Sequence, residues 1–214
     1  LTRNRMGRVS TSEAVVLKTY DIGDSDRYCI FLTPLYGRIN VCAKGVRKTT
    51  SKMGSSLQTF QYLNVDLAEH SSGFYLRSAK CLESFENIRK DISKCQSASR
   101  GCELIFRLIH ESEPSENIFA ILKAYLSICN ESENEKLFPT LQMMLFRELG
   151  LLPSFREDES MSDSLKSYLS FVGSFEQSIE NQISDSDLVK LSMVCNEILK
   201  DELNYPLKSE SVSC

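Results

Sequence analysis

The sequence predicts an α+β protein with two parts, a small β-barrel at the N-terminus followed by an all-α helical domain. Residues 1–80 hold short apolar segments of alternating polarity, separated by turns with glycine and polar residues, which is typical of strands. From residue 81 onward glycine is rare and apolar residues recur at spacings of three and four, which is typical of helices packed on a core. We therefore expect one domain over residues 1–80 and a second over residues 81–214.

The charge of the chain divides at the same place. The 214 residues carry a net charge of -4, but residues 1–80 hold 12 Lys and Arg against 6 Asp and Glu, a net of +6. Residues 81–214 hold the other 13 Lys and Arg against 23 Asp and Glu, a net of -10. Such asymmetry indicates two modules with different partners, and the basic module is the candidate for binding a polyanion.

Five short strands are predicted in the basic part, at residues 13–20, 27–33, 38–44, 57–67 and 73–81. Pro34–Gly37 forms a tight turn between the second and third strands, and the third alternates in polarity with a period of two. Five such strands suit a closed barrel, which leaves no sheet edge exposed, and the OB-fold is the commonest five-stranded unit of this kind. An SH3-like barrel gives much the same pattern, so the strand count alone leaves both open.

The loop Lys44–Lys52 contains four cations among glycine, serine and threonine, and no carboxylate occurs from Asn40 to Tyr62. Lys and Arg neutralise phosphate charge and release counterions, while hydroxyls and exposed amides donate hydrogen bonds to phosphate oxygens. The loop therefore predicts a DNA-binding surface, with these residues as its members: Arg27, Arg38, Lys44, Arg47, Lys48 and Lys52, extended by Lys18. Aromatic residues for base stacking are expected among Tyr36, Phe60, Tyr62, Phe74 and Tyr75, although each of them could instead belong to the core.

The acidic part predicts amphipathic helices over residues 102–111, 115–126, 141–149 and 187–203. Ser115 is expected to cap the second of these helices, and Gly150 to end the third in a left-handed conformation. The polar, acidic stretch Arg156–Asp163 is expected to form a surface loop.

No pattern in the sequence predicts catalysis, a cofactor or a metal site. Nucleophile elbows, phosphate-binding Walker loops and zinc-protease motifs are absent from the sequence, and the 8 cysteines include no C-x-x-C pair. We expect reduced, buried thiols, and an enzyme that uses Cys29 or Cys42 is disfavoured because neither has a histidine nearby in sequence. His110 is expected to act as a cation at a helix end rather than as a base. No apolar run is long enough to cross a bilayer, so no membrane partner is expected.

Several short motifs resemble one known family. They are Ala14–Lys18, Gly23–Arg27, Gly37, the string Ala43–Arg47 and Leu57–Phe60. Together these residues resemble the N-terminal domain of the bacterial recombination mediators of the RecO family, and Ala-Lys-Gly-x-Arg after a strand is the most specific of them. The helical part is similar more loosely, at Glu103–Leu104, Leu149–Gly150, Pro153 and Pro206–Ser209.

The resemblance implies an N-terminal OB-fold, a C-terminal helical domain and a role in DNA repair. Members of the family bind single- and double-stranded DNA, anneal complementary strands and, with RecR, help RecA replace the protein SSB. They also bind the C-terminal tail of SSB. The family resemblance therefore implies a bacterial cytoplasmic protein at the nucleoid, without enzymatic activity or cofactor.

Two departures from the family pattern bear on this expectation. Residues 154–194 contain no cysteine, where many members carry a cysteine cluster, so no zinc site is expected there. The helical part is strongly acidic, which argues against DNA contact by that part. The main alternative is a barrel that serves as a protein-interaction adaptor without binding DNA, and RNA is an alternative nucleic-acid ligand.

Overall fold

The structure is a computed structural model that describes residues 8–49, 51, 53–54, 57–152, 162–171, 175 and 184–203. Its contacts divide the chain into two compact units. The first joins Leu1–Glu86 to Ile109–Phe119, and the second joins Asn87–Leu108 to Ala120–Cys214. The expected boundary after residue 80 falls inside the last strand of the barrel, which continues to Glu83.

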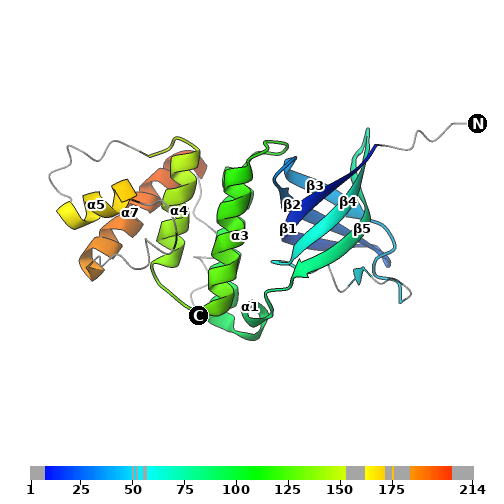
Figure 1. Ribbon diagram of the computed structural model, residues 1–214, viewed down its shortest axis with the longest axis horizontal. Coiled ribbons are helices and arrows are strands. Elements are labelled where there is room, and N and C mark those ends of the chain that lie inside the picture. The colour runs from blue at the N-terminus through cyan, green and yellow to red at the C-terminus, as the bar shows by residue number, and fades with distance from the viewer. Residues whose placement is uncertain are drawn as a thin grey trace, which may run out of the picture. The chain divides into compact units, whose positions relative to one another are not determined.

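The first unit is a closed five-stranded barrel (Figure 1). Its strands are β1 (Val9–Ile22), β2 (Asp26–Thr33), β3 (Gly37–Ala43), β4 (Tyr62–His70) and β5 (Gly73–Glu83). They follow the order β1-β2-β3-β5-β4, with β4 returning to β1. The β3–β5 pair is parallel and the other four pairs are antiparallel. The predicted five-stranded OB-fold, followed by helices, is confirmed.

The fourth strand begins five residues later than the sequence predicts. Phe60 has a positive φ of 76°, which takes the backbone out of the extended conformation before pairing starts at Tyr62. The Phe60 N–H donates to the Val16 carbonyl at 2.8 Å, and the Val16 N–H donates to the Gln61 carbonyl at 3.0 Å. Leu57 is fully buried, so this stretch adds a side chain to the barrel core although it precedes β4.

Alternate residues of the strands fill the barrel interior. The core includes Ala14, Val16, Cys29, Phe31, Ile39, Val41, Leu63, Val65 and Leu67. This period of two leaves the intervening side chains of each strand on the outer surface. It thereby decides which side chains of β1, β2, β3 and β5 can meet a ligand.

The segment Ile109–Phe119 packs along the start of β3. The Ser112 N–H donates to the Arg38 carbonyl at 3.1 Å, and Asn40 Nδ2 donates to Glu111 Oε1. Gly37 has a φ of 64°, and any Cβ at this position would collide with the backbone of Glu113. Glycine is therefore required at residue 37 both by conformation and by space.

The second unit is helical (Figure 1), as predicted. The described helices are α1 (Glu86–Lys90), α2 (Ile92–Leu108), α3 (Glu116–Glu131), α4 (Leu137–Glu148), α5 (Asp163–Phe171) and α7 (Asp185–Leu203). Ser115 caps α3 as expected, since its Oγ accepts the Ile118 N–H at 3.2 Å. Gly150 follows α4 with a φ of 70°, the expected left-handed stop.

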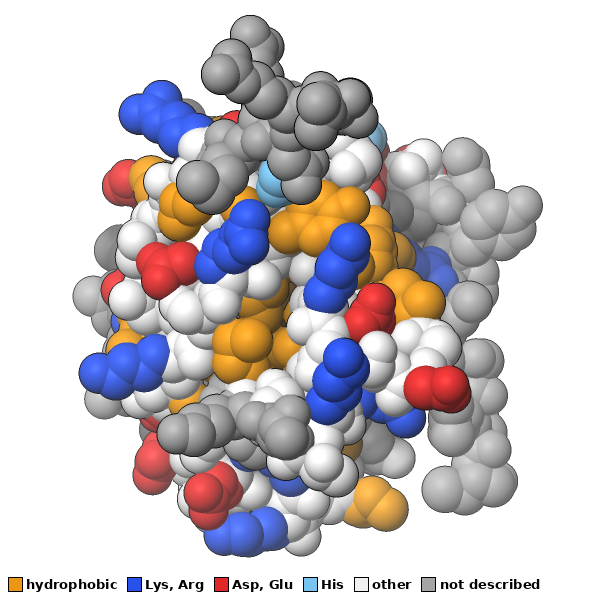
Figure 2. Space-filling model, turned by 90° about the vertical axis from the view of Figure 1, so that its right-hand side faces the viewer, with side chains coloured by type: hydrophobic (Ala, Val, Ile, Leu, Met, Phe, Trp, Pro, Cys, Tyr) orange, Lys and Arg blue, Asp and Glu red, His pale blue; other side chains and the backbone are white. Residues whose placement is uncertain are grey.

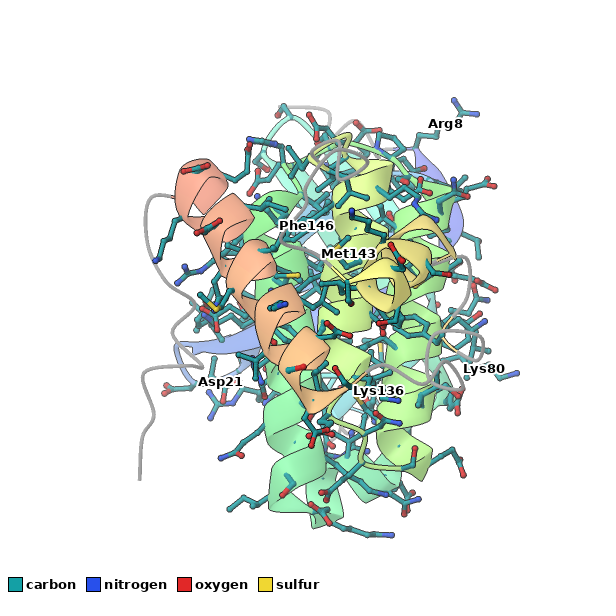
Figure 3. All side chains as sticks on the ribbon, turned by 90° about the vertical axis from the view of Figure 1, so that its left-hand side faces the viewer. Arg8, Asp21, Lys80, Lys136, Met143 and Phe146 are labelled. Carbon is teal, nitrogen blue, oxygen red and sulfur yellow. The ribbon has the colours of Figure 1, made fainter. Side chains whose placement is uncertain are left out.

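Close packing holds these helices together. Tyr125 is fully buried and donates from its hydroxyl to the Ser97 carbonyl at 2.6 Å, and a Cβ on Gly101 would collide with its ring. Figure 3 labels Met143 and Phe146 of α4, both fully buried. The thiol of Cys195 in α7 lies 3.7 Å from the Met143 sulfur, so α7 packs on α4.

The acidic stretch Arg156–Asp163 lies outside the described residues up to position 161. Its end, which the sequence predicts as loop, starts α5 at Asp163. Among the described helices, none is long and apolar enough to cross a membrane.

Candidate nucleic-acid interface

The residues Lys44–Lys48, which we call the basic turn, follow β3 and are held in place by the turn between β1 and β2. Asp26 Oδ1 accepts the Gly45 N–H at 2.7 Å, and the Arg47 N–H donates to the Ser25 carbonyl at 3.0 Å. The Gly45 amide holds the pKa of Asp26 below its ordinary value, as do the Ser25 hydroxyl and the nearby Lys44 and Lys48. The two stretches that carry the family motifs, 23–27 and 43–47, are therefore one joined structure.

Two of the predicted DNA-binding arginines, Arg27 and Arg47, bind groups of the neighbouring loops and stabilise this structure. Arg27 Nε donates to Asp21 Oδ1 at 2.8 Å and its Nη1 donates to the Leu57 carbonyl at 2.9 Å. Arg47 Nε lies 3.3 Å from the other oxygen of Asp21, and its Nη1 donates to the Gly23 carbonyl at 2.8 Å. The hydrogen bond from Arg27 is the main reason why the pKa of Asp21 is lowered. Both guanidinium groups are thus partly neutralised, and they hold loops in addition to any contact with phosphate.

Arg38 lies apart from the other predicted residues. It is the second residue of β3, whereas Lys44 follows the end of that strand, and the six residue steps between them span about 20 Å. Arg38 Nε donates to the Ile109 carbonyl at 2.7 Å, and its Nη1 lies 3.7 Å from Glu111 Oε1. Its side chain is 14% exposed, so it fastens the segment Ile109–Phe119 to the barrel.

Lys44 and Lys48 remain as exposed cations of the basic turn, together with the half-exposed Arg47. Lys52 lies outside the described residues. Figure 2 faces the barrel side of the molecule and shows Lys and Arg side chains spaced around hydrophobic ones, a colour class that includes tyrosine. The surface therefore presents cations and hydrophobic side chains together.

Three tyrosines and one cysteine form a row across four strands on the outside of the barrel. The register pairs Tyr20 of β1 with Tyr28 of β2, Tyr28 with Cys42 of β3, and Cys42 with Tyr75 of β5. Tyr20 is 44% exposed, and the other three are partly exposed. We call these four residues the tyrosine row.

A lysine lies over the tyrosine at each end of this row. Lys18 Nζ lies 5.0 Å from the centroid of the Tyr20 ring, and Lys44 Nζ lies 5.0 Å from the centroid of the Tyr75 ring. Partly exposed rings beside cations are what single-stranded nucleic acid requires, since bases stack on the rings while the cations meet phosphates.

Most of the aromatics expected to stack belong to the core instead. Phe60 and Tyr62 are 5% and 7% exposed, and Tyr36 and Phe74 pack against the barrel core and each other. Tyr75 alone of the five lies in the row. Tyr20 and Tyr28 are not among the aromatic residues expected to stack, although the sequence carries a signal for them. Tyr28 precedes the buried Cys29, so the alternation of β2 places its side chain on the outer surface. The three-residue turn between β1 and β2 then sets the register that pairs Tyr20 with Tyr28.

Within the described residues, the cysteines and histidines form no metal-binding cluster, and Cys29 is not an activated thiol. No three His, Cys, Asp or Glu there are grouped so as to hold a metal ion. Burial raises the pKa of the Cys29 thiol to about 12, so that thiol is protonated at neutral pH and a poor nucleophile. His110 lies with its Nδ1 3.6 Å from Glu113 Oε2, on an exposed segment.

Comparison with known families covers both units. Residues 6–85 match the family described as "Recombination protein O N terminal", and residues 89–175 match "Recombination protein O C terminal". The chain belongs to the RecO family.

Individual RecO relatives agree with this assignment. The chain is 29% identical over 148 residues to the DNA repair protein RecO of Thermoanaerobacter sp. (strain X514), covering 68% of the chain and 60% of that relative. It is 34% identical over 148 residues to that of Nocardioides sp. (strain ATCC BAA-499 / JS614), again covering 60% of the relative. With Dehalococcoides mccartyi (strain ATCC BAA-2100 / JCM 16839 / KCTC 5957 / BAV1) the identity is 28% over 161 residues, covering 75% of the chain and 64% of the relative. The chain therefore spans less than two thirds of the length of these relatives, each of which is described as a DNA repair protein.

Proposed function

We propose that this chain is a non-enzymatic recombination mediator whose barrel binds single- and double-stranded DNA through the tyrosine row and the basic turn. The observation that carries the proposal is the row itself, with Lys18 and Lys44 over its outer rings. The strand order is that of an OB-fold, in which the face of strands 2 and 3 is the usual nucleic-acid surface.

The proposed mechanism needs no covalent step and no cofactor. Bases of a single strand stack on Tyr20, Tyr28 and Tyr75, and their phosphates meet Lys18, Lys44 and Lys48. Neutralised phosphates repel each other less, so a second, complementary strand can approach and anneal. The residues of this face bind and screen; none of them has to transfer a proton or a group.

The family resemblance supports the remaining part of the proposal. In it, the chain works with RecR to help load RecA onto strands coated with SSB, and it binds the C-terminal tail of SSB. The acidic helical part, with its net charge of -10 over residues 81–214, is poorly suited to DNA. We therefore assign DNA to the barrel and contacts with proteins to the helices.

The first test removes the two exposed lysines of the basic turn. Lys44→Gln with Lys48→Gln should weaken binding to a fluorescent oligo-dT at least tenfold at low salt, measured by anisotropy. It should also reduce the salt slope by about one to two units, because each lost phosphate contact removes a little under one unit. Lys190→Gln with Lys200→Gln is the matched control, since it removes the same charge from the exposed surface of α7. Equal affinities for the two double variants would overturn the assignment.

The second test addresses stacking. Tyr20→Leu and Tyr28→Leu should each weaken single-strand binding about fivefold or more, because stacking of one base on an aromatic ring contributes about 1–3 kcal/mol. Duplex DNA keeps its bases stacked internally, so its affinity should change little. Binding of an acidic peptide by the unaltered chain, without binding of either DNA, would instead identify a protein adaptor.

A further inference from the structure

A hollow of about 460 Å³ lies on the barrel at the Tyr75 end of the tyrosine row. Six of its lining residues carry polar groups: Lys44, His70, Ser71, Ser72, Tyr75 and Arg77. They come from two places, the end of β3 and the β4–β5 hairpin, whose two-residue turn is Ser71–Ser72. Its volume falls within the roughly 300–1,000 Å³ typical of small-ligand sites.

The charged residues that line the hollow are both positive. Lys44 and Arg77 are exposed cations, three hydroxyls accompany them, and no carboxylate is among the described residues that line the hollow. In a chain with a net charge of -4, such a lining is suited to an anion. Ammonium, guanidinium and hydroxyl donors together are the usual partners of phosphate oxygens.

The ring of Tyr75 contacts three other residues that line this hollow. Lys44 Nζ lies 5.0 Å from its centroid, and the His70 ring meets it edge-on with centroids 5.1 Å apart and an interplanar angle of 87°. The Tyr75 hydroxyl lies 3.2 Å from Ser72 Oγ. Cys42 and the largely buried Leu76 complete the wall. A partly exposed aromatic ring beside a cation offers a planar base a stacking surface, with donors for its phosphate alongside.

We infer that this hollow is a binding site for one nucleotide, with the base against Tyr75 and the phosphate between Lys44, Arg77 and the Ser71–Ser72 turn. The site rests on the proposed DNA interface, which it adjoins through Tyr75 and Lys44. Its ligand is either a nucleotide within a bound strand or a free mononucleotide, since both present the same base and phosphate.

The chain offers an internal reporter for this site, because it has only two histidines. His70 lines the hollow, whereas His110 belongs to the segment Ile109–Phe119 and its side chain is 83% exposed. A ¹H–¹³C spectrum of the histidine rings in the full chain therefore contains one signal from the site and one control signal. The probes are thymidine 5′-monophosphate, thymidine, inorganic phosphate and oligo-dT, added at constant pH and ionic strength.

Thymidine 5′-monophosphate should shift the His70 signal along a saturable curve and leave the His110 signal in place. Thymidine and inorganic phosphate, which each supply half of the ligand, should bind at least tenfold more weakly. Arg77→Gln should weaken the nucleotide about fivefold, since it removes one charge-assisted contact at an exposed position. Lys80→Gln, an equal loss of charge at an exposed position of the same strand outside the hollow, should leave the curve unchanged.

The oligo-dT arm separates this inference from the proposed function. If oligo-dT binds with its normal salt slope but neither it nor the mononucleotide shifts His70, the nucleotide site is refuted and DNA binding stands. If the mononucleotide shifts His70 but oligo-dT does not bind, the site stands as one for free nucleotides and the DNA interface is refuted. Equal shifts of both histidines, or equal effects of Arg77→Gln and Lys80→Gln, would show nonspecific attraction and overturn the site.

Discussion

At the scale of single residues, Asp26 positions the basic turn although it carries the charge that DNA repels. Its carboxylate accepts the Gly45 N–H at 2.7 Å. Asp26→Ala removes this acceptor, and we expect the turn to lose its fixed position. Affinity for oligo-dT should fall about fivefold, because the turn loses a hydrogen bond to a charged acceptor.

Asp24→Ala is the control, because Asp24 lies exposed in the turn between β1 and β2, two residues before Asp26. The structure shows no hydrogen bond or ion pair for it among the described residues. Both substitutions remove one negative charge, which by itself favours DNA. Asp24→Ala should therefore leave affinity unchanged or slightly higher, while Asp26→Ala lowers it. Anisotropy titrations of the two variants side by side decide the matter. A gain in affinity for Asp26→Ala equal to that for Asp24→Ala would mean that the carboxylate acts only through its charge.

At this scale the sequence predicts the kind of residue better than its role. The cations of Lys44–Lys52 are visible as a run, but nothing in the run distinguishes Arg47, which is bound to Asp21 and Gly23, from the exposed Lys48. The contacts of Arg47 join residues more than twenty positions apart in the sequence, and they form only when the barrel closes. The tyrosine row as a whole cannot be recognised from the sequence for the same reason, because its members come from four strands that barrel closure brings together.

At the scale of elements, the Gly37 corner joins β3 to the segment Ile109–Phe119. Gly37→Ala should destabilise the chain by about 2–5 kcal/mol, the sum of a left-handed backbone penalty and a collision with the Glu113 backbone. Gly23→Ala is the matched control, since Gly23 has a similar φ of 53° but nothing lies within 4 Å of an added Cβ. It should cost only the backbone part, about 1–2 kcal/mol. Urea unfolding followed by circular dichroism measures both; equal losses would show that the close approach to Glu113 is not required.

Elements with a strong local signal are predicted well, and those set by distant contacts are not. Ser115 and Gly150 mark helix ends by their own chemistry, so both are found from the sequence. The start of β4 is set by the positive φ of Phe60 and its hydrogen bond to Val16, and neither can be read from the types of residues 57–61. The packing of Ile109–Phe119 with the barrel likewise depends on Arg38, about seventy residues earlier in the sequence.

At the scale of the whole molecule, four ionised carboxylates stabilise the two units. The pKa of four aspartates lies below the ordinary value of 3.8: Asp21, Asp26 and Asp66 in the barrel and Asp187 in the helical unit. The largest causes are hydrogen bonds, from Arg27 to Asp21, from the Gly45 amide to Asp26, from Ser78 to Asp66 and from Ser164 to Asp187. Each carboxylate binds a proton less readily in the folded chain than in the unfolded one.

The sign of the pH dependence follows directly from these lowered pKa values. Above the unfolded pKa both states are ionised and the stabilisation is complete; as the pH falls through the folded pKa values it is lost, because the unfolded chain has taken up more protons. The urea midpoint should therefore stay nearly level above about pH 5 and decline below it. Asp66→Asn removes one of the four groups, so its curve should start lower at neutral pH and decline less steeply on acidification. Asp24→Asn should run parallel to the unaltered chain, whereas a midpoint that rises on acidification would contradict the role of these carboxylates.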